Sequence, residues 1–223
     1  MMDKHPILIV VSVEQEKTAV LSGLGNSPYV DVHICGVGMA KAAAKTAKLL
    51  AQKPYRGVIN MGIAGGFSGE AQIGSIVVAE SIIAPEIGAE SPEGFIPVDD
   101  LGFGSQTMSP FVDTHLLGKL ASKAEVRAGR VLTVLTATGT AETMKRRMAT
   151  YGAVAEAMEG YGVASATEEF GIPFTEIRSI SNMVGVRDKA SWDFPAAFAG
   201  LKKVAECLRE VEESEHSLFT MSE

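Results

Sequence analysis

Cysteine is scarce in this chain of 223 residues, which contains only Cys35 and Cys207. The two could form a disulfide, but we interpret them as buried free thiols, and they show no metal-ligand spacing. No stretch approaches the roughly 18 consecutive apolar residues of a membrane span. The first residues also lack the long apolar segment and cleavage site of a secretory signal. We therefore expect a cytoplasmic protein without a metal.

Basic residues are fewer than acidic ones. Lysine and arginine total 20, aspartate and glutamate total 27, and the net charge is −7. An acidic surface without a basic run argues against a partner that is nucleic acid or a membrane surface. The composition favours a small-molecule ligand. The length and the 46% hydrophobic content favour one domain over residues 1–213, followed by a frayed tail at 214–223.

Apolar runs rich in β-branched residues alternate with helical segments along the chain. Strands are expected at 7–13, 30–35, 57–61, 75–84, 130–136, 153–155 and 174–181. Helices are expected at 14–24, 39–52, 113–123, 140–151, 159–170 and 195–213. Residues 85–110 are expected to form a long irregular excursion. The alternation predicts an α/β fold, a three-layer αβα sandwich around a mostly parallel or mixed sheet.

Two glycine clusters follow expected strands. Gly36-Val37-Gly38 and Gly62-Ile63-Ala64-Gly65-Gly66 allow the backbone to turn tightly or to approach a ligand closely. The first cluster is not a full G-x-G-x-x-G motif, because Lys41 occupies the third glycine position. No P-loop pattern and no G-x-S-x-G elbow are present. We therefore expect no cofactor and no serine-hydrolase chemistry.

Polar side chains also gather at the ends of the expected strands, where ligands of such sheets bind. Glu14 and Glu16 follow the first strand, although carboxylates there also compensate the positive end of a helix. Glu159 lies among small and apolar residues with no basic neighbour in sequence. A partly buried carboxylate needs partners, and two adjacent sugar hydroxyls would supply them. Asn182 ends a strand and could equally be a turn residue.

Four segments in this order resemble the signatures of the nucleoside phosphorylase and nucleosidase family. They are Val13-Glu14-Gln15-Glu16, Asn60-Met61-Gly62-Ile63-Ala64-Gly65-Gly66, Ala157-Met158-Glu159-Gly160 and Ile180-Ser181-Asn182. The resemblance covers residues 7 to 210. It implies that Glu16 activates the attacking water, that Glu159 binds the ribose 2′ and 3′ hydroxyls, and that Asn182 contacts the purine. It also implies substrate contacts at Ala64, Gly65, Met158, Ala137 and Thr138.

Two positions depart from the family pattern. Ala157 replaces a frequent glutamate, so hydroxyl binding rests on Glu159 alone. Asn182 replaces the aspartate that protonates adenine. An amide does not usefully give up a proton, but it donates a hydrogen bond to N7 or O6 of a purine. A 6-oxo base needs such stabilisation more than protonation, and one well-placed donor contributes about 3 kcal/mol to a transition state. Asn182 therefore favours a 6-oxo purine.

Within the family, residues 85–95 and 181–192 resemble the branch that hydrolyses futalosine to hypoxanthine and dehypoxanthine futalosine in menaquinone biosynthesis. Arg187 or Lys189 could hold the 5′ carboxylate of that substrate, with Met39, Phe95 and Phe103 as apolar walls. Arg187 could equally pair with Asp188 or Asp193. A methylthioadenosine or S-adenosylhomocysteine nucleosidase and a silent nucleoside-binding module are the alternatives.

Two further expectations follow from the resemblance. Phosphorolysis is disfavoured, because no arginine precedes Arg56 while Glu14 and Glu16 stand where phosphate would bind. Family members often assemble as dimers or larger and share pocket residues across the interface. A homo-oligomer, a dimer or tetramer, is therefore expected.

Overall fold

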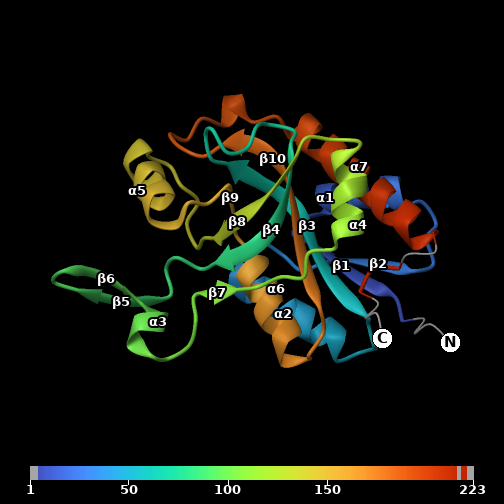
Figure 1. The fold of residues 1–223 in the computed structure, drawn as a ribbon, viewed down its shortest axis with the longest axis horizontal. Helices are drawn as coiled ribbons and strands as arrows, with labels where there is room; N and C mark the ends of the chain where they lie inside the picture. Colours follow the sequence, from blue (N-terminus) through green and yellow to red (C-terminus); the bar gives the residue numbers. More distant parts are fainter. Residues whose placement is uncertain (1–4, 215–216, 220–223) are drawn as a thin grey trace.

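The computed structural model describes residues 5–214 and 217–219. Within them, an eight-stranded mixed sheet forms the centre of the molecule (Figure 1). Its strands are β1 (Ile7–Val11), β2 (Val30–Ile34), β3 (Gly57–Gly66), β4 (Ile76–Ile83), β7 (Thr107–Met108), β8 (Val126–Thr133), β9 (Ala155–Ala157) and β10 (Phe174–Met183). β1 is parallel to β2 and β3, whereas β9 is antiparallel to β3. The expected mixed α/β sheet is confirmed.

Helices cover both faces of this sheet (Figure 1). The first apolar cluster joins sheet residues to α2 (Met39–Leu50) and α6 (Gly160–Glu169) through Leu49 and Val163. The second joins the sheet to α1 (Glu14–Leu24), α4 (Thr114–Ala121) and α7 (Phe194–Glu212) through Val20, Leu116 and Leu201. A third, smaller cluster seats α5 (Ala141–Tyr151). Cys35 and Cys207 are buried free thiols, as expected.

Part of the sheet is closed into a ring by strand pairing. β10 pairs in parallel with β3 and antiparallel with β4, while β4, β8, β9 and β3 are joined in turn. These five strands therefore form a ring, with β1 and β2 extending it beyond β3. The ring brings the final residues of β3, β9 and β10 together in one place.

Helix boundaries follow from local capping. The Asp193 side chain accepts a hydrogen bond from the Ala196 amide at 2.8 Å and starts α7 with Pro195 in its first turn. The Thr140 hydroxyl does the same for α5, which ends at Gly152 in a left-handed conformation. Of the helices in the described part of the chain, none has the length and apolar content to cross a membrane.

The excursion at 85–110 is more ordered than expected. It contains the hairpin β5 (Gly88–Ser91) and β6 (Gly94–Pro97), the short helix α3 (Val98–Leu101) and β7. In Figure 1 the hairpin and α3 project from one side of the molecule. The prediction of an irregular segment is wrong here, because prolines and glycines at the turns hide two short strands that pair with each other.

Other boundaries differ as well. The cluster Gly62–Gly66 does not end a strand but continues β3, because both β9 and β10 pair with it. β8 begins four residues earlier than expected, at Val126 rather than 130, and β9 lies two residues later. The predicted tail is not frayed at Leu218, which is buried and whose amide donates to Glu212 at 2.9 Å. Residues 215, 216 and 220–223 of that tail lie outside the described residues.

Candidate active site

One cavity of about 290 Å³ opens where several strands end. Ser12 and Val13 follow β1, Val134 follows β8, and the last residues of β3, β9 and β10 complete the wall. The wall thus joins segments from five strands that are distant in sequence. This position matches the expectation that the polar clusters lie at the carboxyl ends of strands.

Glu16 lies at the base of this cavity, in the first turn of α1. Its Oε2 accepts hydrogen bonds from the amides of Ser12 at 2.7 Å and Val13 at 3.2 Å, and its Oε1 accepts from the Ile63 amide at 2.9 Å. The residue is only 2% exposed. Burial raises the pKa of Glu16, although these amides and Arg178 oppose the shift. Its role as a helix cap and its position at the cavity therefore coincide.

Glu159 and Arg178 meet beside Glu16. The Glu159 Oε1 atom accepts from the Gly38 amide at 3.1 Å, and its Oε2 lies 3.3 Å from Nη1 of Arg178. Arg178 is fully buried and also pairs with Glu176 at 2.7 Å. Burial opposes the charge of Arg178, but Glu176, Glu159 and Glu16 outweigh it and raise its pKa. The inference that Glu159 has no basic neighbour is wrong, because β10 supplies one.

Gly62 brings this charged group and Glu16 together. A Cβ atom added at Gly62 would lie 2.5 Å from Nη1 of Arg178 and 2.9 Å from Oε1 of Glu16. The missing side chain leaves space in which the guanidinium and the carboxylate approach each other. Arg178 therefore acts electrostatically on both cavity carboxylates.

Asn182 lies at the end of β10 and lines the same cavity. Its Nδ2 donates to the carbonyl of Met183 at 3.2 Å, and its Oδ1 accepts from the Ser181 hydroxyl at 2.9 Å. An amide nitrogen has two hydrogens, so one donor of Nδ2 remains for a ligand. The same Nδ2 would lie 3.3 Å from a Cβ added at Gly65. The donor of this amide is thus directed over Gly65.

Other expected residues share the same cavity. It is lined by both predicted catalytic residues and by the following predicted substrate-binding residues: Ala64, Gly65, Ala137, Thr138, Met158, Glu159 and Arg187. Arg187 follows β10, and its guanidinium lies over the Trp192 ring at 5.6 Å. Trp192 also lines the cavity, immediately after a short 3-10 helix at Lys189–Ser191.

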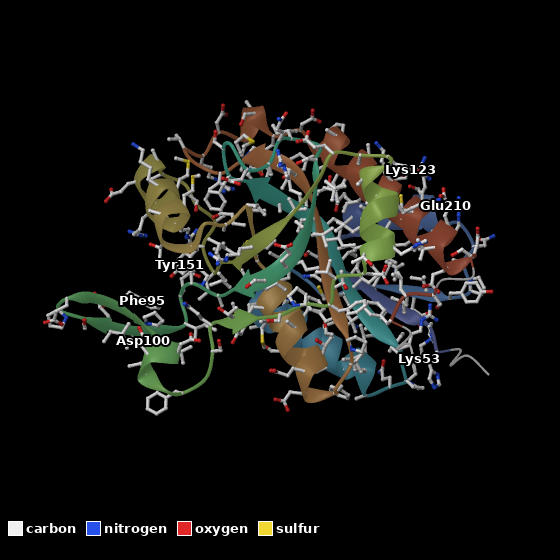
Figure 2. All side chains as sticks on the ribbon, viewed as in Figure 1. Lys53, Phe95, Asp100, Lys123, Tyr151 and Glu210 are labelled. Carbon is white, nitrogen blue, oxygen red and sulfur yellow. The ribbon has the colours of Figure 1, made fainter. Side chains whose placement is uncertain are left out.

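The three residues expected to form apolar walls do not line this cavity. Met39 begins α2 outside the cavity lining, with its backbone against Gly162. Phe95 lies on the projecting hairpin, where Figure 2 labels it, and lines a separate hollow there. Phe103 is 84% exposed just beyond α3. Val37, Val134 and Val186 supply apolar surface to the cavity instead.

The sequence reasoning gave no role to three polar residues at or beneath the wall: Arg178, Glu156 and Ser12. Glu176 and Arg178 alternate along a strand with both side chains buried, and two opposite charges at this spacing are a signal for an internal ion pair. Glu156 lines the cavity next to the recognised Glu159 motif. The hydroxyl of Ser12 is buried without a hydrogen-bond partner among the described atoms and lies at the wall near Glu16.

This arrangement suits a polar ligand and hydrolytic chemistry. A buried carboxylate with a raised pKa is able to accept a proton from water, and a second carboxylate is able to accept hydrogen bonds from hydroxyl groups. An amide in the same cavity is able to donate a hydrogen bond to a leaving group. In the described part of the chain, no three His, Cys, Asp or Glu residues are grouped as metal ligands.

Comparisons with known proteins agree with this geometry. The chain is 45% identical over 190 residues to a futalosine hydrolase of Streptomyces coelicolor, covering 82% of this chain and 80% of that protein. It is 45% identical over 215 residues to a futalosine hydrolase of Acidothermus cellulolyticus, covering 87% and 86%. A solved structure of Helicobacter pylori futalosine hydrolase has the same fold, with a TM-score of 0.77 at 19% identity, and covers 92% of this chain and 96% of that one. The phosphorylase superfamily matches residues 10–218, a range that includes every residue lining the cavity, and the chain belongs to that superfamily.

Proposed function

We propose that this protein hydrolyses the N-glycosidic bond of futalosine to hypoxanthine and dehypoxanthine futalosine. The observation that carries the proposal is that one cavity contains both Glu16, a carboxylate able to activate water, and Asn182, an amide donor. Relatives named futalosine hydrolase, 45% identical over most of their length, support the same substrate.

Glu16 acts as the general base. It accepts a proton from a water molecule, whose oxygen attacks C1′ of the ribose while the bond from C1′ to the base breaks. The bonding electrons leave with the purine, which takes up a proton. Burial raises the pKa of Glu16, so its carboxylate is a better proton acceptor than an exposed glutamate. The unpartnered Ser12 hydroxyl beside it is suited to hold the same water.

Glu159 binds the ribose through its 2′ and 3′ hydroxyls. It is 4% exposed and fixed by the Gly38 amide and Arg178. A carboxylate accepts up to four hydrogen bonds. Protein donors occupy part of that capacity, and adjacent hydroxyls fill the remainder. Ala157 contributes no second carboxylate.

Asn182 stabilises the leaving base. Its Nδ2 donates toward N7 or O6 while negative charge accumulates on the purine. Hypoxanthine carries that charge with a hydrogen bond alone, so an amide suffices. Ala64, Gly65, Met158, Ala137 and Thr138 form the walls on which the nucleoside lies.

The 5′ end of futalosine carries a carboxylate on an aryl ketone. Arg187 at the cavity provides a cation for that carboxylate, and Trp192, over which it stacks, provides an aromatic face. Arg187 is therefore the proposed anchor of the 5′ group.

Water rather than phosphate is the proposed nucleophile. The cavity wall contains the carboxyl groups of Glu16, Glu156, Glu159 and Asp188 against the single guanidinium of Arg187. A phosphate dianion in this field would be repelled. The balance of charge around Glu16 favours hydrolysis over phosphorolysis.

The proposed setting is the menaquinone pathway in the cytoplasm, with the chain assembled as a homo-oligomer. Exposed apolar side chains on and beside the excursion, among them Phe95 at 45% and Phe103 at 84%, support assembly. A strain that lacks its own futalosine hydrolase and requires menaquinone tests the pathway. Growth without menaquinone on expression of this chain is expected.

The direct test is incubation with futalosine, inosine and methylthioadenosine, with and without phosphate, while free base is measured. We expect hypoxanthine from futalosine without phosphate, and little adenine from methylthioadenosine. Adenine release at comparable kcat/KM would favour the methylthioadenosine and S-adenosylhomocysteine nucleosidase alternative. A requirement for phosphate would contradict hydrolysis, and absence of any base release would favour a silent binding module.

A further inference from the structure

Glu156 faces Asn182 across a glycine. In the sheet, Gly65 of β3 is paired with Asn182 of β10 on one side and with Glu156 of β9 on the other. A Cβ added at Gly65 would lie 3.3 Å from Nδ2 of Asn182 and 3.7 Å from Cγ of Glu156. Both side chains therefore reach the space over Gly65, and all three residues line the cavity. The missing side chain leaves a slot over Gly65 that is bordered by the Asn182 amide, the Glu156 side chain and Cγ2 of Val184.

The Glu156 carboxylate has one acceptor position left. Its Oε1 accepts from the Thr138 amide at 2.7 Å, and its Oε2 accepts from the Thr138 hydroxyl at 2.6 Å and from Nη1 of Arg147 at 3.1 Å. A carboxylate oxygen has two lone pairs, so Oε2 is filled while Oε1 has room for another donor. Glu156 is 7% exposed, and a buried charged group of this kind needs its partners.

The same residues hold the carboxylate in place and keep its surroundings negative. Arg147 also pairs with Glu86 at 2.7 Å and donates to the Thr138 hydroxyl at 2.7 Å. One guanidinium thus serves two carboxylates, which leaves this group of three side chains with a net negative charge. A group that is an acceptor only, fixed from behind, favours a ligand that offers a hydrogen-bond donor.

We propose that Glu156 is a second specificity-determining residue for the leaving base, whose Oε1 accepts a hydrogen bond from N1–H of a 6-oxo purine. This inference rests on the proposed function and extends it to the far edge of the base. A 6-oxo purine presents acceptors at N7 and O6 and a donor at N1, which complement the amide donor of Asn182 and the carboxylate of Glu156. A 6-amino purine has a lone pair at N1 that the carboxylate repels.

The test is the substitution Glu156→Gln, with kcat/KM measured for futalosine and for its 6-amino counterpart. Glutamine keeps the size of the side chain, but its amide donates to the N1 lone pair of a 6-amino base. We expect the preference for the 6-oxo substrate to fall by about 100-fold or more, because sites built around a substrate hydrogen bond discriminate strongly. Equal loss on both substrates would overturn the inference, since it would mean that Glu156 only orders the cavity wall.

Two control variants distinguish recognition of the base by Glu156 from a role of Glu156 in ordering the cavity wall. Glu86→Gln disturbs the same arginine outside the cavity and should leave the ratio of the two substrates unchanged. Glu156→Asp retains an acceptor and should keep the preference at a lower rate, which preserves the test if the glutamine variant does not fold. A changed ratio in Glu86→Gln, or a lost preference in Glu156→Asp, would also overturn the inference.

Product binding distinguishes the failure of this inference from failure of the proposed function. Calorimetry with hypoxanthine and adenine needs no turnover. The unsubstituted protein should prefer hypoxanthine, and Glu156→Gln should lose that preference, whichever nucleoside is cleaved. If futalosine is not hydrolysed but the preference for hypoxanthine depends on Glu156, the proposed substrate is wrong and the role of Glu156 in base recognition is retained. If futalosine is hydrolysed and the Glu156→Gln variant still prefers hypoxanthine, the role of Glu156 in base recognition is wrong and the proposed substrate is retained.

Discussion

The Glu16 side chain, the proposed general base, is held in place at the start of its own helix. Its carboxylate caps α1 through the Val13 amide and reaches across to the Ile63 amide of β3. Burial nevertheless dominates and raises its pKa above the ordinary value of 4.5. The same contacts that order the side chain therefore leave it with the proton affinity that a general base requires.

The first prediction is a shifted acid limb in the pH profile. Glu16 must be ionised to accept a proton, so activity falls as the pH drops through its raised pKa. We expect kcat/KM for futalosine to decline with an apparent pKa above 4.5. Circular dichroism over the same pH range controls for unfolding. A limb at or below 4.5 in folded protein would mean that another group activates the water.

The second prediction removes that base. Glu16→Gln should lower kcat for hypoxanthine release by about 10²- to 10⁴-fold, the usual contribution of general base catalysis. The neighbouring Glu14→Gln is a matched control, because Glu14 lies in the same helical turn but outside the cavity lining. Wild-type rates in Glu16→Gln would exclude its role in catalysis.

The third prediction concerns Asn182, the proposed hydrogen-bond donor to the purine. Asn182→Asp replaces an amide by a carboxylate, which accepts hydrogen bonds but does not donate them when ionised. We expect kcat for futalosine to fall by about 10²-fold. Adenine release from methylthioadenosine should rise relative to it, measured by competition between the two substrates. An unchanged ratio would contradict the assignment of Asn182 to the base.

Helix α7 is positioned by a close contact with α1. Gly23 of α1 lies against α7, and a Cβ added there would meet the carbonyl of Lys202 and lie 2.8 Å from the Cβ of Ala205. Glycine therefore allows the two helices to approach each other. α7 in turn packs on β10, the strand that carries Arg178 and Asn182.

The fourth prediction uses two glycines in helices. Gly23→Ala should lower the free energy of unfolding by about 1–3 kcal/mol, because the added methyl forces the α1–α7 pair apart. Gly118→Ala in α4 meets nothing within 4 Å and should raise it by up to about 1 kcal/mol through helix propensity. Urea denaturation measures both. Equal effects of the two substitutions would show that the close approach at Gly23 does not control packing.

The whole molecule presents an excursion with exposed phenylalanines away from its sheet. The hairpin of β5 and β6 projects with α3, and Figure 2 labels Phe95 and Asp100 on this part. Phe103, in the turn after α3, is among the most exposed large apolar side chains described. Such a surface favours association with a second copy of the chain.

The fifth prediction follows from this surface. Phe103→Ser should shift the protein from a homo-oligomer toward the monomer in light scattering at micromolar concentration. Phe170→Ser is the control, because Phe170 is 42% exposed at the far end of α6. A monomeric unsubstituted protein would contradict the proposed assembly. An oligomer that loses its subunits equally in both variants would move the interface elsewhere.

The alternation of strands and helices was predictable from the sequence, because apolar periodicity and capping are local properties. The order of Glu16, Glu159 and Asn182 at strand ends was predictable as well, since those ends meet at one edge of an α/β sheet. Relatives of 45% identity and the common cavity agree with that interpretation. Short strands hidden among prolines and glycines were not predictable, because their pairing is with distant residues.

Which side chains meet depends on how the strands are arranged in the folded molecule. Arg178 reaches Glu159 from β10, and Glu156 faces Asn182 across Gly65, through pairings of three strands that the chain visits far apart. Met39 is two residues from the cavity residue Val37 but lies outside the cavity lining, at the start of α2. Strand order and register are set by the burial of the whole sheet, so no local pattern contains these contacts.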